Sequence, residues 1–204
     1  MSTFKTEQEE FWAGEFGINY VKRNTNYLSN IPLFSNIFSK TNKVNSIIEL
    51  GANIGNNLQA INSILPHANL SAIEINSDAV KELEQIKDIK VYNQSLLDFK
   101  VDHKRDFVLI KGVLIHIAPN YLAQLYDLLY NLSDKYICIA EYYNPTPVEL
   151  KYRGHDNKLF KRDFAGEILD KFSDLELIDY GFVYHRDNNF PQDDITWFLL
   201  KKTK

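Results

Sequence analysis

Short apolar runs alternate with amphipathic stretches from Val44 onward, and no other feature constrains the fold as strongly. This alternation is typical of a parallel sheet whose two faces are covered by helices. We expect strands at residues 46–50, 70–74, 89–92, 106–110 and 136–141, and helices at 56–65, at 121–132 and from Ser77, which should cap its own helix. A helix at 162–172 precedes two final runs, 175–180 and 195–200, which have no helix between them and should therefore pair antiparallel. The sequence thus predicts an α/β fold with a doubly wound, Rossmann-like sheet of seven strands, mostly parallel, that ends in an antiparallel C-terminal hairpin.

The first 43 residues precede the sheet and are expected to be helical. Acidic residues at 7–10 favour a helix start, and Gly14 and Gly17 interrupt that helix. A second helix at about 19–30 should stop before Pro32, because the residue before a proline is pushed out of the helical region. We expect residues 1–43 to form a helical lid or extension and residues 44–204 to form one globular domain, since 204 residues bury one sizeable core but not two.

Charge and apolar content exclude several classes of partner. Charged residues make up 25% of the chain and the net charge is only -4, which does not indicate binding to nucleic acid or to an anionic membrane. No stretch approaches the roughly 20 apolar residues that cross a bilayer, and the N-terminus lacks the apolar core of a signal peptide, so we expect a cytoplasmic protein. The single cysteine, Cys138, lies in an apolar run and should be a buried structural thiol. The histidines are scattered without metal-ligand spacing, so no metal is expected, and nothing indicates an oligomeric state.

A glycine-containing loop, residues 49–55 (ELGANIG), follows the first expected strand. Doubly wound sheets bind ligands in the crevice beyond the carboxyl ends of their strands, where this loop must lie. Its glycines, Gly51 and Gly55, are spaced more loosely than the G-x-G-x-x-G of dinucleotide-binding folds, because Asn53 takes the place of the middle glycine. The looser loop suits a ligand without phosphates that has an adenosine and an amino-acid end. A simple turn is the alternative interpretation.

Glu74 ends the second expected strand, 19 residues after Gly55. This is close to the spacing at which an acidic side chain accepts hydrogen bonds from both ribose hydroxyls, and its charge would repel the ribose phosphate of NADP. A solvated glutamate at a strand end is the alternative.

These residues resemble the class I S-adenosylmethionine-dependent methyltransferases, in which an acidic-x-Gly loop follows the first strand and an acidic residue ends the second. The closing strand pair is also similar to that family, in which the last strand inserts antiparallel between its neighbours. The resemblance covers the whole chain and implies S-adenosylmethionine as the cofactor. It implies a cofactor site made by Glu49, Gly51, Asn53, Gly55, Lys111 and Gly112 around the methionine half, Glu74 at the ribose, and Ser95 and Leu96 at the adenine.

Longer strings resemble a narrower group, the methylases associated with pseudaminic acid biosynthesis. These strings are residues 6–17 (TEQEEFWAGEFG) with Tyr20 and Arg23, residues 152–155 (YRGH), and residues 159–166 (LFKRDFAG). This resemblance implies an acceptor that is an acidic bacterial sugar, a nonulosonic acid or a nucleotide-sugar related to it. It does not name the atom that is methylated.

Methyl transfer from a sulfonium is an in-line displacement, so such an enzyme mainly aligns the reactants and excludes water. A hydroxyl or ammonium acceptor must also lose a proton, and a histidine at the ligand end of a strand is a suitable base. His116, soon after the fourth expected strand, is the first candidate, and His155 is the second. Each is equally consistent with a histidine that only supports the structure.

The polar segment 142–162 leaves the fifth expected strand at the same edge as the cofactor loop. Arg153 is the preferred carboxylate ligand, because its planar guanidinium binds a carboxylate bidentately. The expected acceptor contacts are Tyr20, Arg23, Tyr142, Tyr143, Asn144 and Arg153. A solvated basic loop is the alternative to this interpretation.

Two alternatives to a methyltransferase remain open. One is a non-catalytic cofactor-binding subunit of a glycan-synthesis complex. An NAD-binding oxidoreductase is the third possibility, although the loop at 49–55 lacks the middle glycine and the chain lacks a separate substrate domain.

Overall fold

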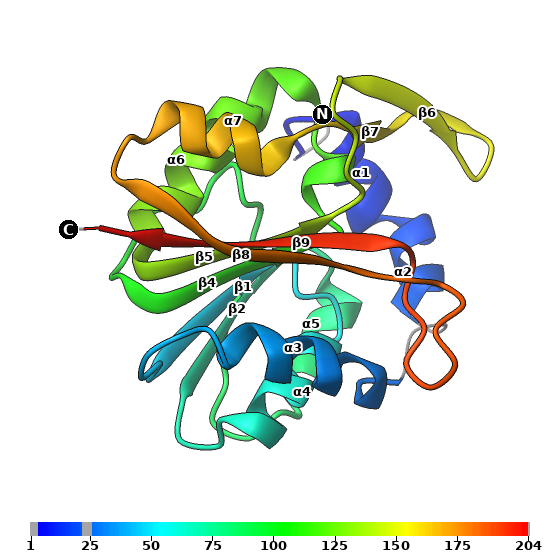
Figure 1. Cartoon of the computed structure of the whole chain (residues 1–204). Coiled ribbons are helices and arrows are strands. Elements are labelled where there is room, and N and C mark those ends of the chain that lie inside the picture. Colours follow the sequence, from blue (N-terminus) through cyan, green and yellow to red (C-terminus); the bar gives the residue numbers. More distant parts are fainter. Residues whose placement is uncertain (1–3, 22–25, 204) are drawn as a thin grey trace.

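In the computed structural model, which describes residues 4–21 and 26–203, the expected strands form one seven-stranded sheet (Figure 1). Its strands lie in the order β3, β2, β1, β4, β5, β9, β8. Their bounds are β1 (Ser46–Leu50), β2 (Asn69–Glu74), β3 (Lys90–Asn93), β4 (Arg105–Lys111), β5 (Ser133–Glu141), β8 (Leu175–Val183) and β9 (Ile195–Lys202). The predicted fold class is confirmed.

The C-terminal strand β9 lies between β5 and β8 and is antiparallel to both, as predicted. The remaining pairs, from β3 to β5, are parallel. The chain adds β2 and β3 on one side of β1 and then crosses to place β4 on the other side. This reversal opens a crevice between the carboxyl ends of β1 and β4, where doubly wound sheets bind ligands.

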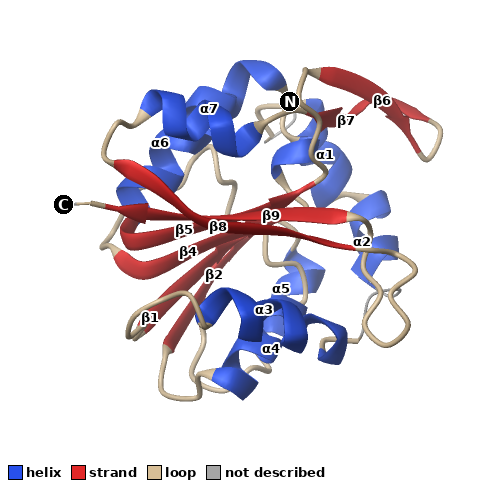
Figure 2. Ribbon diagram, in the orientation of Figure 1, coloured by secondary structure: helices blue, strands red, loops and turns tan. Residues whose placement is uncertain are grey.

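Two layers of helices cover the sheet, which explains why its strands are apolar on both faces (Figure 2). Neighbouring residues of β1 show this: Ile47 packs into the core on one face and Ile48 into the core on the other, and both are fully buried. The helices on the first of these faces are α3 (Ile31–Phe38), α4 (Asn56–Ile64) and α5 (Ser77–Leu83), and those on the second are α6 (Leu122–Leu132) and α7 (Phe164–Lys171). Three short 3-10 helices, η1 (Leu28–Asn30), η2 (Leu114–His116) and η3 (Pro119–Tyr121), lie in the connections.

The N-terminal helices differ from the prediction. Helix α1 (Glu7–Ala13) ends at Gly14 as expected, but α2 (Glu15–Val21) contains Gly17 and no helix spans 19–30 in the described residues. Helix α3 begins where the expected helix should have ended. Pro32 lies in the first turn of α3, where a backbone N–H has no partner within the helix, so the N–H that proline lacks is not needed. Gly17 lies so close to α1 that a Cβ there would be 1.8 Å from the Trp12 carbonyl oxygen.

Two further local predictions are corrected. Asn76, and not Ser77, caps α5, because the Asn76 side-chain oxygen accepts hydrogen bonds from the backbone N–H groups of Asp78 (2.9 Å) and Ala79 (3.2 Å). The segment 142–162, expected to be a polar loop, contains a separate hairpin of β6 (Val148–Tyr152) and β7 (His155–Lys161). Residues 148–152 (VELKY) alternate apolar and polar side chains as a strand does, although β6 is largely exposed.

The hairpin tip is a two-residue turn, Arg153 and Gly154, with φ values of 47° and 91°. Two central residues with positive φ are typical of the type I′ turn, whose twist matches that of the flanking strands. Glycine adopts this conformation freely, whereas an arginine there is strained.

Cys138 lies on β5 and is fully buried, which confirms the prediction of a structural thiol. Burial raises the pKa of its thiol to about 12. Across the described residues, no helix has both the length and the apolar character needed to span a bilayer.

Candidate active site

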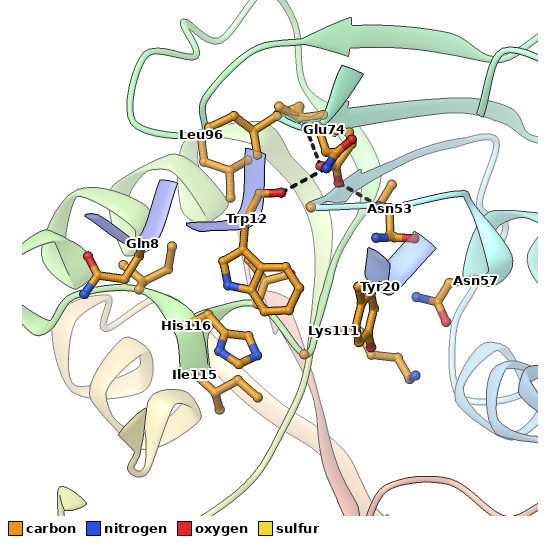
Figure 3. A pocket seen from close by; sticks show the side chains of 18 of the residues that line it. Gln8, Trp12, Tyr20, Asn53, Asn57, Glu74, Leu96, Lys111, Ile115 and His116 are labelled. Carbon is orange, nitrogen blue, oxygen red and sulfur yellow. Dashed lines mark hydrogen bonds between the residues drawn. The ribbon is translucent and has the colours of Figure 1, made fainter. Parts of the chain in front are cut away.

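A cavity of about 580 Å³ is lined by residues at the carboxyl ends of β1, β2 and β4, by α1 and by the tip of the hairpin. Figure 3 shows Glu74, Lys111, Trp12 and His116 among its side chains. The cavity brings together eleven of the residues that the sequence predicted for a site: Gly51, Asn53, Glu74, Ser95, Leu96, Lys111, Gly112, His116, Tyr20, Tyr142 and Arg153. Glu49, Gly55, Tyr143, Asn144 and His155 do not line it. Arg23 lies outside the described residues.

The loop after β1 has left-handed backbone at three of its residues. Gly51, Asn53 and Gly55 have φ values of 69°, 49° and 81°. Asparagine adopts this conformation more readily than most residues, so Asn53 replaces a glycine without breaking the loop. A Cβ on Gly51 would lie 2.6 Å from a methyl carbon of Val113, so the loop after β1 and the turn after β4 touch only because residue 51 has no side chain.

Glu74 holds this loop against the end of β2. Its carboxylate accepts hydrogen bonds from the backbone N–H groups of Asn53 (2.7 Å) and Asn76 (2.8 Å), one on each oxygen. The side chain is 7% exposed, and burial raises its pKa in spite of these bonds. Each oxygen can accept a further hydrogen bond from a ligand.

A buried polar cluster lies at the ends of β1, β4 and β5, and Lys111 and Asn57 line the cavity from it. Glu49 accepts a hydrogen bond of 2.6 Å from the Asn57 amide through Oε1, while its Oε2 has no partner within the described part of the chain. Burial raises the pKa of Glu49 to about 8 and lowers that of Lys111. Glu141 at the end of β5 is also buried, and its pKa is raised to about 7.

Helix α1 crosses the cavity and is tied to its rims on two sides. On one side, the Ser95 hydroxyl donates to the Glu9 carboxylate and the Lys5 ammonium pairs with Asp98. Toward the hairpin, the Gln8 amide donates to the carbonyl of Asn157 at 2.9 Å. These ties carry α1, whose Gln8, Glu9 and Trp12 line the cavity, across the ends of the strands (Figure 3).

His116 ends η2 and is held by the hairpin. Its Nδ1 lies 2.6 Å from the carbonyl oxygen of Lys158, so Nδ1 carries the proton and donates. Burial lowers the pKa of His116 to about 4, which leaves the ring neutral and its Nε2 an acceptor. The ring lies between aromatic side chains, with centroid distances of 4.6 Å to Trp12 and 4.9 Å to Tyr152.

The predicted residues that do not line the cavity have other surroundings. The His155 ring lies 5.0 Å from the ring of Phe11 and does not line the cavity, so its placement does not favour a role as base. Tyr143 is exposed and its ring lies 5.9 Å from that of Phe198, whereas the Asn144 amide donates to the Thr146 carbonyl. Glu49 lies in the buried cluster next to Asn57, and Gly55 precedes α4.

Several residues of the site were not predicted: Gln8, Asn57, Asn76, Glu141 and Gln192. Asn76 and Glu141 lie at or just beyond the carboxyl ends of β2 and β5, so the rule that identified Glu74 could also have found them. Gln8 has no such signal, because it reaches the site only through the packing of α1. Within the described chain no three His, Cys, Asp or Glu side chains form a group suited to a metal ion.

No family model matches the chain, and no curated protein shows a significant sequence match. Solved structures do match. The plantazolicin methyltransferase BpumL in complex with SAH superposes with a TM-score of 0.67 at 16% identity, covering 97% of this chain and 94% of that one. The 1,6-didemethyltoxoflavin-N1-methyltransferase of Burkholderia thailandensis gives 0.70 at 12% identity, with 97% and 87% covered.

A third structure, the magnesium protoporphyrin IX methyltransferase of Synechocystis with bound SAM, gives a TM-score of 0.67 at 12% identity and covers 100% of both chains. The names of the three proteins refer to three different compounds: plantazolicin, 1,6-didemethyltoxoflavin and magnesium protoporphyrin IX. Together the likenesses show that this chain has the fold of the class I methyltransferases.

Proposed function

We propose that this protein is an S-adenosylmethionine-dependent methyltransferase that acts on a small acceptor. The observation that carries the proposal is the shared cavity, in which the loop after β1, Glu74 and Lys111 meet the aromatic surroundings of His116. The fold supports it, because solved structures with this fold include methyltransferases with bound SAM or SAH.

The residues at the carboxyl ends of the parallel strands fit this cofactor. Glu74 retains lone pairs for ribose hydroxyls. The Asn57 amide oxygen, which has no partner among the described residues and belongs to a residue that lines the cavity, suits the ammonium of the methionine end, with Glu49 behind it, and the Lys111 ammonium suits its carboxylate. Ser95 and Leu96 line the part of the cavity assigned to the adenine. When bound, S-adenosylmethionine supplies a methyl group on a positively charged sulfur. The chain itself positions the acceptor and excludes water.

The acceptor end lies around His116 and the hairpin tip. The neutral imidazole accepts a hydrogen bond at Nε2, so it orients an acceptor hydroxyl and takes its proton as the new bond to carbon forms. Trp12 and Tyr152 flank the ring and offer flat apolar faces. Tyr20 and Tyr142 line the same end and add hydroxyl groups.

Within this function, we favour an acidic sugar of the pseudaminic or nonulosonic class, or a nucleotide-sugar, as the acceptor. Arg153 lines the cavity from a strained turn and forms no salt bridge with a carboxylate of the described residues. A carboxylate of the acceptor would satisfy its guanidinium bidentately. Aromatic and hydroxyl-bearing side chains suit the alternating apolar and polar surface of a sugar ring. Action in the cytoplasm is part of the same proposal.

Isothermal calorimetry with S-adenosylmethionine, S-adenosylhomocysteine and NAD tests the cofactor. We expect micromolar binding of the first two and none of NAD. Binding of NAD alone would refute the methyltransferase and favour an oxidoreductase.

A second experiment tests turnover and the acceptor. The protein is incubated with methyl-labelled S-adenosylmethionine and a panel of nonulosonic acids, their nucleotide conjugates and neutral sugars. Label on an acidic member, lost in Arg153→Ala, supports the proposal. Label only on neutral sugars refutes the acidic acceptor, and cofactor binding without transfer to any acceptor favours a non-catalytic subunit.

A further inference from the structure

Glu141, at the carboxyl end of β5, makes contacts that the proposed chemistry does not use. The residue is 3% exposed, and its Oε1 accepts two hydrogen bonds, from the backbone N–H groups of Val113 and Leu114, both at 2.9 Å. Its Oε2 is buried without a described partner. The Glu141 carboxylate therefore binds the backbone of two residues that lie 28 and 27 positions earlier in the sequence.

That segment is the start of η2. Gly112, with φ 67°, turns the chain out of β4, and Val113 and Leu114 present N–H groups that a helical turn leaves without internal partners. A negatively charged side chain is a strong acceptor for such groups. Glu141 therefore fixes the first turn after β4 against the end of β5.

η2 carries His116 as its last residue. The His116 backbone N–H donates to the Val113 carbonyl at 2.9 Å, so the imidazole is one short turn away from the anchored N–H groups. The ring has a second anchor, the hydrogen bond of Nδ1 to the Lys158 carbonyl. One anchor holds the backbone before His116 and the other holds its ring, and together they determine the direction of Nε2.

We propose that Glu141 is a positioning residue for His116: its carboxylate holds the turn on which the imidazole stands and so aims Nε2 at the acceptor. The role at the acceptor rests on the proposed function. The positioning of the ring does not, because it follows from contacts within the chain.

The first experiment reads the ring directly and needs no acceptor. Nitrogen-15 histidine NMR of the full chain, with the His116 signals assigned by their loss in His116→Gln, should show a neutral ring with the proton on Nδ1. In Glu141→Gln the amide oxygen replaces Oε1 and accepts both N–H groups, so the His116 signals should stay at their wild-type positions. In Glu141→Ala the turn loses both bonds, and the signals should broaden while the His116 pKa moves from about 4 toward its ordinary 6.5. Wild-type signals and pKa in Glu141→Ala would overturn the proposal.

The second experiment reads turnover with the acceptor identified by the methyl-label screen. Loss of the anchoring bonds should lower kcat about 10-fold to 100-fold in Glu141→Ala, since one hydrogen bond to a charged group is worth about one to two factors of ten in rate. Glu141→Gln should restore kcat to within about threefold, because its oxygen accepts the same bonds. The dissociation constant of S-adenosylhomocysteine should stay within about threefold in both, because Glu141 does not line the cavity. Equal loss in the Gln and Ala variants, or loss of cofactor binding with kcat, would refute positioning.

The pH profile gives a third readout. Among the described residues, Lys111, Tyr126 and Tyr142 are titratable groups in electrostatic contact with Glu141. As the pH falls through about 7, Glu141 gains a proton and its bonds to η2 lose their charge assistance, so wild-type kcat should fall, by no more than the roughly threefold loss expected for the neutral side chain of Glu141→Gln. Glu141→Gln should lack this acid limb, and a limb kept unchanged in that variant would contradict the proposal.

Matched controls complete the design. Glu176→Gln changes an exposed glutamate on β8 and should behave as wild type in every readout. If Glu141→Ala does not fold, as judged by its thermal unfolding, Glu141→Asp is used in its place. Its side chain is one methylene shorter and should weaken both bonds, with an intermediate loss of kcat. Wild-type protein that binds no cofactor would refute the proposed function and leave the NMR result on His116 interpretable.

Discussion

The two ends of the cavity, which we propose to bind the cofactor and the acceptor, are built in different ways. The cofactor end is made by strand ends and the loops after them, and its key hydrogen bond, from Asn53 to Glu74, joins residues 21 positions apart. The acceptor end is made by α1, η2 and the hairpin, and it depends on contacts such as Gln8 to Asn157, 149 positions apart, and His116 to Lys158, 42 apart. The sheet therefore determines the first end, while segments added around the sheet determine the second. Changes at the cofactor end should disturb both the fold and cofactor binding, whereas changes at the acceptor end should leave both largely intact.

The largest effect is expected at Glu74. Glu74→Ala leaves the buried N–H groups of Asn53 and Asn76 without acceptors, each at a cost of about 1–3 kcal/mol, and it removes the proposed ribose ligand. We expect the dissociation constant of S-adenosylhomocysteine, measured by calorimetry, to rise at least about 100-fold, because that corresponds to about 3 kcal/mol. Glu82→Ala, at an exposed position of α5, is the control. Unchanged affinity in Glu74→Ala would remove the distinction between the two ends.

The next effect is the pH dependence of stability from Glu49. Its pKa is about 8 when folded and 4.5 ordinarily, so between these values the folded chain holds a proton that the unfolded chain releases. The stability from this proton is complete below pH 4.5 and is lost as the pH rises through about 8. Glu49→Gln keeps an oxygen for the Asn57 amide but does not titrate, so at pH 8 it should be more stable than wild type by a few kcal/mol. Urea unfolding from pH 5 to 8 measures this, and parallel curves for the two proteins would contradict it.

A smaller effect separates two glycines that both have positive φ. Gly51→Ala adds a Cβ at 2.6 Å from Val113 in a conformation that alanine disfavours, whereas Gly112→Ala meets the same backbone strain with no atom within 4 Å. We expect Gly112→Ala to lower the unfolding free energy by about 1 kcal/mol and Gly51→Ala by about 2–3 kcal/mol. Equal losses by chemical denaturation would show that the loop after β1 does not need its close approach to η2.

The smallest effect is expected where α1 meets the hairpin. Glu7→Gln removes the ion pair with the Lys158 ammonium at 3.0 Å, in which the glutamate side chain is 59% exposed. The Glu7 side chain is solvated, although that of Lys158 is only 9% exposed, and the glutamine oxygen can still accept from the ammonium, so the loss should be about 1 kcal/mol. The melting temperature should change by only a few degrees, and the affinity for S-adenosylhomocysteine should not change. A loss of cofactor affinity similar to that of Glu74→Ala would show that α1 belongs to the cofactor end.

The same division explains which parts were predictable from sequence. The strands and the antiparallel closing pair follow from apolar runs and from the helices present or absent between them, whereas the insertion of β9 between its neighbours was implied only by the family resemblance. Gly51 and Glu74 follow from the rule that ligands bind at strand ends. Some local signals have two interpretations and led to errors. Pro32 was expected to end a helix, but it lies in the first turn of α3. The β6–β7 hairpin was missed because the charged residues of the segment were taken as a polar loop, although residues 148–152 (VELKY) alternate apolar and polar side chains. The tie between His116 and Lys158 uses a backbone carbonyl, which leaves no trace in side-chain identity.

The β6–β7 hairpin lies between β5 and α7 in the sequence and adds no strand to the seven-stranded sheet. Its two strands pair with each other, so lengthening, shortening or rewriting this ribbon changes no register within the sheet. The hairpin sequence can therefore change during evolution while the fold stays the same. If the hairpin contacts the acceptor as proposed, its replacement alone can change the acceptor preference. For engineering, the hairpin is the segment to graft or randomise when a different acceptor is wanted on the same scaffold.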